Sequence, residues 1–170
     1  LVIEAMKVSE TPKKIPHHKD NAGVIVKGMD NLMIRVAKCC NPVLGDDIIG
    51  FITKGRGISV HRTDCANMTS LPEEEKLRFI DVEWDMSQDA EYDAEVTILA
   101  NDRKGLFSDI SKVCESNDIR MTGVHTGTLK TDGTLTITLT LAIVNIGQME
   151  KLLLSFKNVP SVIQVYRSKA

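Results

Sequence analysis

Three cysteines and one histidine fall in a single turn-rich part of the chain, an arrangement that can hold a metal ion. Cys39 and Cys40 are adjacent and precede an Asn-Pro turn signal, whereas His61 and Cys65 are four residues apart and follow a loop with two glycines. Three thiolates and one imidazole have the right chemistry and number for a tetrahedral zinc ion. We therefore predict a zinc site made by these four side chains.

A packing role for the same side chains is the alternative. Neighbouring side chains in an extended backbone point to opposite faces, so Cys39 and Cys40 can reach one ion only where the chain turns sharply. The spacing also lacks the C-x-x-C pair of unambiguous zinc motifs. Without a metal, the thiols would pack as small buried hydrophobic groups and His61 would bond to the backbone. Catalysis by a cysteine is not expected, because no base and carboxylate are placed to activate it.

The composition is that of a globular protein of one or two domains. The 170 residues are 42% hydrophobic and 26% charged, which is enough to bury a core. Only 4% are aromatic, which argues against a stacking platform for single-stranded nucleic acid. No apolar run approaches the ~20 residues of a membrane-spanning helix, and the four cysteines make a poor disulfide framework. We expect a soluble protein of a reducing cytoplasm with no membrane partner, and its opening residues resemble the tail of a longer chain.

Turn signals and charge divide the sequence into two modules and two linkers. The first linker is rich in proline, and acidic side chains gather between residues 69 and 91. Neither module is basic enough to predict nucleic-acid binding from charge alone. The predicted boundaries are a linker at 1–22, a mixed α+β cysteine and histidine module at 23–86, a linker at 87–91 and a second module at 92–170.

Short apolar runs in the first module predict strands rather than long helices. Two glycines between residues 53 and 57 join two of these strands as a hairpin, and Asp64 is a candidate N-cap for a short helix. Ile80, Val82 and Trp84 alternate and predict one strand at 79–84. The other predicted strands are 24–26, 32–36, 48–52 and 58–60.

The second module has a clearer pattern, of the ferredoxin-like βαββαβ order. Apolar residues at helical spacing, with Cys114 on the apolar face, predict a helix from 106 to about 117, and Asn145 with Gln148 forms a capping pair for a second helix. Asp132-Gly133 predicts a hairpin. The predicted strands are 95–100, 119–130, 135–143 and 161–166. The fold class is therefore α+β.

The cysteine and histidine segment, together with the βαββαβ pattern, resembles the C-terminal regulatory region of the long RelA/SpoT homologues. In these bacterial stringent-response enzymes, a zinc-finger-like module precedes an ACT domain. The resemblance implies that this chain is a non-catalytic, cytoplasmic regulatory fragment. It further implies that the hydrolase and synthetase domains lie upstream in a parent with GTP pyrophosphokinase or guanosine tetra- and pentaphosphate (ppGpp) hydrolase activity.

Three basic residues, Lys54, Arg56 and Arg62, flank His61 in the sequence. Judged by charge alone they form an ordinary solvated surface. The resemblance implies docking of this region on the ribosome, and these side chains would then contact the phosphates of ribosomal RNA with an affinity that falls in salt.

The loop before the first helix of the second module could bind an amino acid. Free N–H groups at a helix start favour a carboxylate, Gly105 permits close approach, and Asp102 could meet an ammonium group. A plain polar loop with a helix cap is the alternative. Because ACT domains often bind such ligands between paired subunits, the resemblance implies a branched-chain amino acid and a homodimer. The candidate residues are Asn101, Asp102, Arg103, Gly105 and Leu106.

Three functional hypotheses follow from these motifs and from the resemblance. The first is a regulatory fragment that relays ribosome occupancy or amino-acid status to catalytic domains upstream. The second is an amino-acid-binding ACT sensor in which the cysteine module is only structural. The third is a module that serves mainly to dimerise the protein through its ACT sheets.

Overall fold

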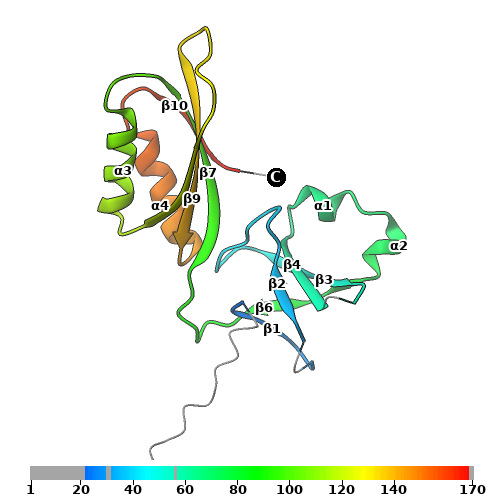
Figure 1. The fold of residues 1–170 in the computed structure, drawn as a ribbon. Coiled ribbons are helices and arrows are strands. Elements are labelled where there is room, and N and C mark those ends of the chain that lie inside the picture. The colour runs from blue at the N-terminus through cyan, green and yellow to red at the C-terminus, as the bar shows by residue number, and fades with distance from the viewer. Residues whose placement is uncertain (1–21, 30–31, 56, 169–170) are drawn as a thin grey trace, which may run out of the picture.

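The computed structural model describes residues 22–29, 32–55 and 57–168. These residues form two α+β modules, as the sequence predicts (Figure 1). The first contains strands β1–β6 with helices α1 and α2, and the second contains β7–β10 with α3 and α4. The linker predicted at 1–22 lies, apart from residue 22, outside the described residues.

Six short strands and two single-turn helices make the first module. Strands β2, β4, β3 and β5 form one sheet in that order, with β2 parallel to β4 and the other pairs antiparallel, and β1 pairs with β6. The elements are β1 Val24–Val26, β2 Ile34–Val36, β3 Ile48–Thr53, β4 Gly57–Arg62, α1 Ala66–Thr69, α2 Glu73–Lys76, β5 Phe79–Ile80 and β6 Val82–Trp84.

The β3–β4 hairpin organises this module. Gly57 opens β4 at φ +81°, where a side chain would collide with the carbonyl oxygen of Met33. Because alternate residues of β4 face opposite ways, Ile58 and Val60 pack into an aliphatic core with β1 and β6. The other face of β4 carries His61 beside a second cluster made of Ala37, Cys40, Cys65 and Met68.

Two local predictions in this module are wrong. The strand predicted at 79–84 is split, because β5 pairs with β3 whereas β6 pairs with β1. Asp64 does not cap α1; the N-cap is Cys65, and the Asp64 carboxylate accepts a hydrogen bond from Arg62 instead. The acidic stretch also contains the helical turn α2, which is not among the predicted elements; Lys76 at its end and Arg78, two residues beyond it, form ion pairs with glutamates three residues earlier.

The second module has the predicted βαββαβ order, and its sheet order β10-β7-β9-β8 is the ferredoxin-like arrangement. Both helices cover one face of the sheet (Figure 1). Cys114 faces the core and is 3% exposed, as expected. The elements are β7 Tyr92–Asn101, α3 Leu106–Ser116, β8 Arg120–Thr126, β9 Thr134–Ile143, α4 Ile146–Lys157 and β10 Val162–Arg167.

The capping pair predicted for α4 is confirmed. The Asn145 side chain accepts a hydrogen bond from the Gln148 N–H at 2.8 Å, and the Gln148 side chain accepts one from the Val144 N–H at 2.9 Å. The Gln148 N–H, which the helix leaves unpaired, is thus satisfied, and so is the N–H of Val144 just before the cap. This reciprocal contact fixes the start of α4, which lies beside a loop of the first module through an Ile146 N–H to Leu44 C=O bond.

Candidate metal centre

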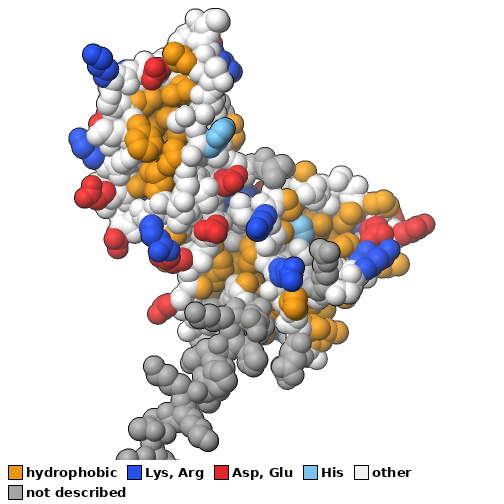
Figure 2. Space-filling model, in the orientation of Figure 1, with side chains coloured by type: hydrophobic (Ala, Val, Ile, Leu, Met, Phe, Trp, Pro, Cys, Tyr) orange, Lys and Arg blue, Asp and Glu red, His pale blue; other side chains and the backbone are white. Residues whose placement is uncertain are grey.

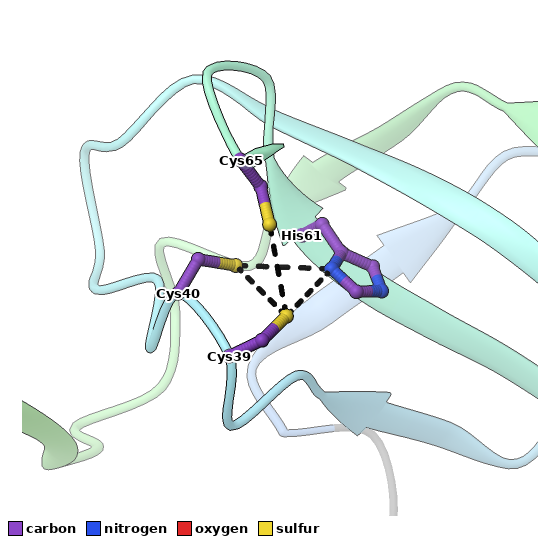
Figure 3. Close-up of side chains that lie close together, drawn as sticks. All are labelled: Cys39, Cys40, His61 and Cys65. Atoms are coloured by element: carbon purple, nitrogen blue, oxygen red, sulfur yellow. Dashed lines mark hydrogen bonds between the residues drawn. The ribbon is translucent and has the colours of Figure 1, made fainter. Parts of the chain in front are cut away.

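The four residues predicted as metal ligands converge on one point (Figure 3). Their ligand atoms all lie within 4.8 Å of one another. The Cys39 Sγ is 3.3 Å from the His61 Nδ1 and 3.6 Å from the Cys65 Sγ, and the Cys40 Sγ is 3.8 Å from the His61 Nδ1. Ligand atoms around a tetrahedral zinc ion lie about 3.5–3.8 Å apart. The four groups are therefore close enough to hold a metal ion.

A sharp turn lets the adjacent cysteines share this point. Asn41 has φ +42°, and its N–H donates to the Ala37 carbonyl at 3.0 Å, so the chain reverses over the cysteine pair. The Cys40 Sγ also accepts the backbone N–H of Arg62 at 3.3 Å. The opposite orientation expected of neighbours on a strand does not apply, because this segment is a turn.

His61 is oriented by a neighbour on its own strand. Its Nε2 lies 2.9 Å from the Ser59 hydroxyl oxygen, which leaves Nδ1 toward the sulfurs. When Nε2–H donates to Ser59, the lone pair of Nδ1 is free for a metal. Burial lowers the pKa of His61, which favours the neutral ring that ligation requires. Ser59 was not among the predicted site residues, although its position two residues before His61 places it on the same strand face.

Burial distinguishes this cluster from exposed thiols. Cys40 and Cys65 are 6% and 7% exposed. Burial raises the pKa of Cys40 to about 12, so the thiol keeps its proton at neutral pH unless a cation replaces it. A buried set of soft donors without a carboxylate ligand matches a closed structural zinc site better than a catalytic one.

The structure separates the predicted RNA contacts. Lys54 is exposed in the turn after β3, whereas Arg62 ends the six-residue strand β4 at the other end of the hairpin, about 16 Å away along that strand. The Arg62 side chain is only 16% exposed and pairs with Asp64 at 2.7 Å. Arg56 lies outside the described residues.

Two exposed basic residues outside the predicted set lie near the cysteines. Arg35 is paired with Ser59 in the β2–β4 ladder and so shares the sheet face of His61, and Lys38 directly precedes Cys39. Their closeness to Cys39 and Cys40 in the sequence is the signal that could have identified them.

The loop before α3 borders a cavity of about 360 Å³. Gly105 has φ +81° and ends the loop, whereas Asn101 closes β7 and does not line the cavity. The Arg103 guanidinium is already bonded to the Asp109 carboxylate at 2.7 Å and the Pro160 carbonyl at 3.0 Å. Figure 2 shows hydrophobic side chains gathered on this face of the second module. The lining residues are Asp102, Arg103, Gly105, Leu106, Phe107, Ser108, Thr126, Leu135 and Ile137.

Two family models match the chain, one over each module. The family model of the RelA/SpoT RIS domain matches residues 24–85, and that of the ACT domain matches residues 88–167. The chain is a RelA/SpoT RIS domain followed by an ACT domain. The cluster of three cysteines and one histidine thus belongs to the RIS domain, and the cavity beside α3 belongs to the ACT domain.

Curated relatives extend the match over nearly the whole chain. A GTP pyrophosphokinase of Escherichia coli (strain K12) is 39% identical over 94% of this chain and 21% of its own length. Similar proteins of Haemophilus influenzae and Streptomyces coelicolor are each 35% identical over 88% and 85% of this chain, and over 20% and 17% of their own lengths. The chain therefore spans about a fifth of these relatives, in their C-terminal region.

Among solved structures, the ACT domain from the GTP pyrophosphokinase of Chlorobium tepidum is 22% identical. It covers 46% of this chain and 99% of its own, with a TM-score of 0.41. The C-terminal domain of the MgtC protein from Mycobacterium tuberculosis is 23% identical, covers 48% of this chain and 92% of its own, and has a TM-score of 0.39. Among the described residues, no helix has the length and hydrophobicity that a membrane crossing requires.

Proposed function

We propose that this chain is a non-catalytic regulatory region of a RelA/SpoT-type ppGpp synthetase or hydrolase. In this proposal a zinc ion holds the RIS domain in shape, and the RIS domain docks on ribosomal RNA. The observation that carries it is the convergence of three sulfurs and one imidazole nitrogen from three separate segments within 4.8 Å. A purified fragment that makes guanosine pentaphosphate from GTP would contradict the non-catalytic part.

Zinc would be a structural ion here. Cys39 and Cys40 come from the turn after β2, His61 from β4 and Cys65 from the start of α1, so one ion would tie three segments together. Two small hydrophobic clusters stabilise the described part of the RIS domain, and metal binding adds directly to the folding free energy of such a module.

Elemental analysis of the purified fragment tests the metal. We expect about one zinc per chain, and we expect Cys65→Ser to lose it. Cys114→Ala is the matched control, because Cys114 lies in the ACT core, and this variant should keep the metal. A wild-type fragment without zinc would support the packed-thiol alternative.

Exposed basic side chains of the RIS domain support the RNA part of the proposal, two of them, Arg35 and Lys38, near the cysteines. Arg35, Lys38 and Lys54 are exposed on the RIS domain, and a rigid surface lets such charges meet phosphates at fixed spacing. Arg62 contributes less, because Asp64 already pairs with it. Docking by phosphate contacts weakens as salt rises, since it releases counterions.

Binding of the labelled fragment to purified ribosomes over a range of salt concentrations tests this docking. We expect the double variant Arg35→Gln and Lys38→Gln to weaken binding. The slope of the logarithm of the binding constant against the logarithm of the salt concentration should fall in magnitude by about two. Lys157→Gln, an exposed charge at the end of α4, should leave both unchanged. Equal loss in both variants, or no binding by the wild type, would contradict the proposal.

A second candidate function is amino-acid sensing by the ACT domain. The cavity beside α3 favours it, because Asp102 lines it together with the apolar side chains of Leu106, Leu135 and Ile137. An ammonium group would meet Asp102 and a branched side chain would meet the apolar wall. Because Arg103 is bonded elsewhere, the ligand carboxylate would depend on backbone N–H groups near Gly105.

Calorimetry with valine, isoleucine and leucine tests this candidate. We expect heat of binding in the wild type and its loss in Asp102→Ala. Asp93→Ala, at the far end of β7, is the control and should bind as the wild type does. If the wild type releases no heat with any of the three, the sensing function is wrong.

Dimerisation through the ACT domain is the third candidate. Strand β8 is an edge strand and five of its seven residues are exposed, so its outer backbone groups are available to a second copy. Sedimentation equilibrium should then show a mass that rises with concentration. A constant monomer mass would contradict this pairing.

A further inference from the structure

A short loop links the metal centre of the RIS domain to the ACT domain. We call residues 41–47 the junction loop; it begins at the residue after Cys40. Arg167, near the end of the ACT strand β10, donates two hydrogen bonds to the Asp46 carboxylate, at 2.8 and 2.7 Å. The same guanidinium donates to the Asn41 carbonyl at 2.6 Å. This clamp is buried, because the side chains of Arg167 and Asp46 are 11% and 8% exposed.

The rest of the junction loop packs on the ACT domain. Val43 is fully buried within the ACT core, although it belongs to the RIS segment of the chain. The Leu44 carbonyl accepts the N–H of Ile146, the first residue of α4, at 2.7 Å. Trp84 donates its indole N–H to the Asp46 carbonyl at 2.9 Å, and its ring meets Tyr92 of β7 edge-on.

Through these contacts, the position of the turn over Cys39 and Cys40 affects the hydrogen bonds of Arg167 in the ACT domain. Arg167 holds the carbonyl of Asn41, whose own φ of +42° belongs to the turn that aims Cys39 and Cys40 at one point. A bidentate arginine pair has strict geometry, and a buried one is destabilising when its partner moves away. A change in the turn over the cysteines therefore displaces an acceptor that the buried guanidinium needs.

We propose that the junction loop couples metal occupancy in the RIS domain to the conformation of β10 and the start of α4 in the ACT domain. This inference rests on zinc binding as proposed above. Bound metal fixes the cysteine turn, and the turn presents Asn41 and Asp46 to Arg167. Because coupling is reciprocal, the clamp must also raise the affinity of the four ligands for the metal.

Zinc affinity of clamp variants tests the coupling from one side. Competition with a chromophoric chelator should show zinc binding weakened about 5- to 150-fold, the usual range of coupled sites, in Arg167→Gln and in Asp46→Asn. Arg120→Gln removes an exposed ion pair with Glu91, whose side chains are 70% and 53% exposed, and should leave the affinity unchanged. Circular dichroism checks that each variant folds.

Hydrogen exchange of the wild-type fragment tests the coupling from the other side and needs no variant. Removal of zinc by a chelator should speed exchange in β10 and at the start of α4, and should leave the distant β8–β9 hairpin unchanged. The fluorescence of Trp84, the only tryptophan, should change with it.

The outcomes separate this coupling from the metal site itself. A fragment that binds zinc but shows equal affinity in the folded clamp variants, or unchanged exchange in β10 on chelation, overturns the coupling and leaves the metal site standing. A wild-type fragment that binds no zinc overturns the metal site and the coupling together.

Discussion

The pair formed by His61 and Ser59 shows how one side chain prepares another for metal binding. His61 can ligate through Nδ1 only when Nε2 carries the proton, and the Ser59 hydroxyl, 2.9 Å away, accepts that proton's hydrogen bond. The backbone of His61 is also fixed, since Ile49 of β3 is its partner across the sheet. The orientation of the imidazole is therefore set before any ion arrives.

We expect Ser59→Ala to weaken zinc binding by about 10- to 100-fold, the usual effect of removing such a partner. Chelator competition at constant pH measures it. Ser108→Ala on the exposed side of α3 is the control and should bind zinc as the wild type does. An unchanged affinity in Ser59→Ala would mean that the ring is oriented by packing alone.

Zinc binding should release protons and therefore tighten as pH rises. Burial raises the pKa of Cys40 to about 12 in the metal-free site, so this thiol is protonated at neutral pH and must lose its proton to bind. Burial lowers the pKa of His61, so the imidazole is already neutral and releases none. Calorimetry in buffers of different ionisation enthalpy counts the protons. Affinity that does not change between about pH 7 and 8 would contradict this account.

Residue types alone pointed to the four side chains that converge, but not to the groups around them. The sequence could not show that Lys54 and Arg62 stand at opposite ends of the β3–β4 hairpin, because that depends on the strand register. Nor could it show that Asp64 pairs with Arg62 rather than capping α1. Arg167 and Asp46, 121 residues apart, carry no local signal of their contact.

Among the secondary-structure elements, those of the ACT domain were predictable because each has its own local signal. The capping residues of α4 and the Asp132-Gly133 turn act within a few residues, and both occur as expected. The RIS strands are two to six residues long, and their pairing is decided by tertiary contacts. The run from Phe79 to Trp84 alternates like one strand, yet its two halves pair with different sheets.

Gly45 shows how one position in the junction loop depends on the facing helix. Its φ is +100°, and an added Cβ would lie 2.6 Å from the Ile146 side chain at the start of α4. We expect Gly45→Ala to lower the free energy of unfolding by about 1–3 kcal/mol. Gly55→Ala is the matched control, because Gly55 also has positive φ but nothing lies within 4 Å of its added Cβ. Urea titration measures both, and an equal loss in the two variants would mean that contact with Ile146 adds nothing.

The whole molecule consists of two domains of different families that share one interface. RIS and ACT matches meet near residue 86, but Val43 and Trp84 of the RIS segment pack on the ACT core. Arg167, near the C-terminal end of the chain, contributes to the same interface through its ion pair with Asp46. Since buried apolar and ionic contacts join the two domains, we expect them to unfold together rather than as separate units.

Val43→Ala tests this cooperation directly. The side chain is fully buried in the ACT core, so removing two methyl groups should lower the free energy of unfolding by about 1–3 kcal/mol. Val144→Ala is the control, because Val144 is 39% exposed and its loss should be smaller. Urea curves from Trp84 fluorescence, which reports the junction, and from far-UV circular dichroism, dominated by the ACT helices, should coincide in both variants. If instead the two probes separate, or Val43→Ala shifts only one of them, the RIS and ACT domains are independent folding units that merely touch.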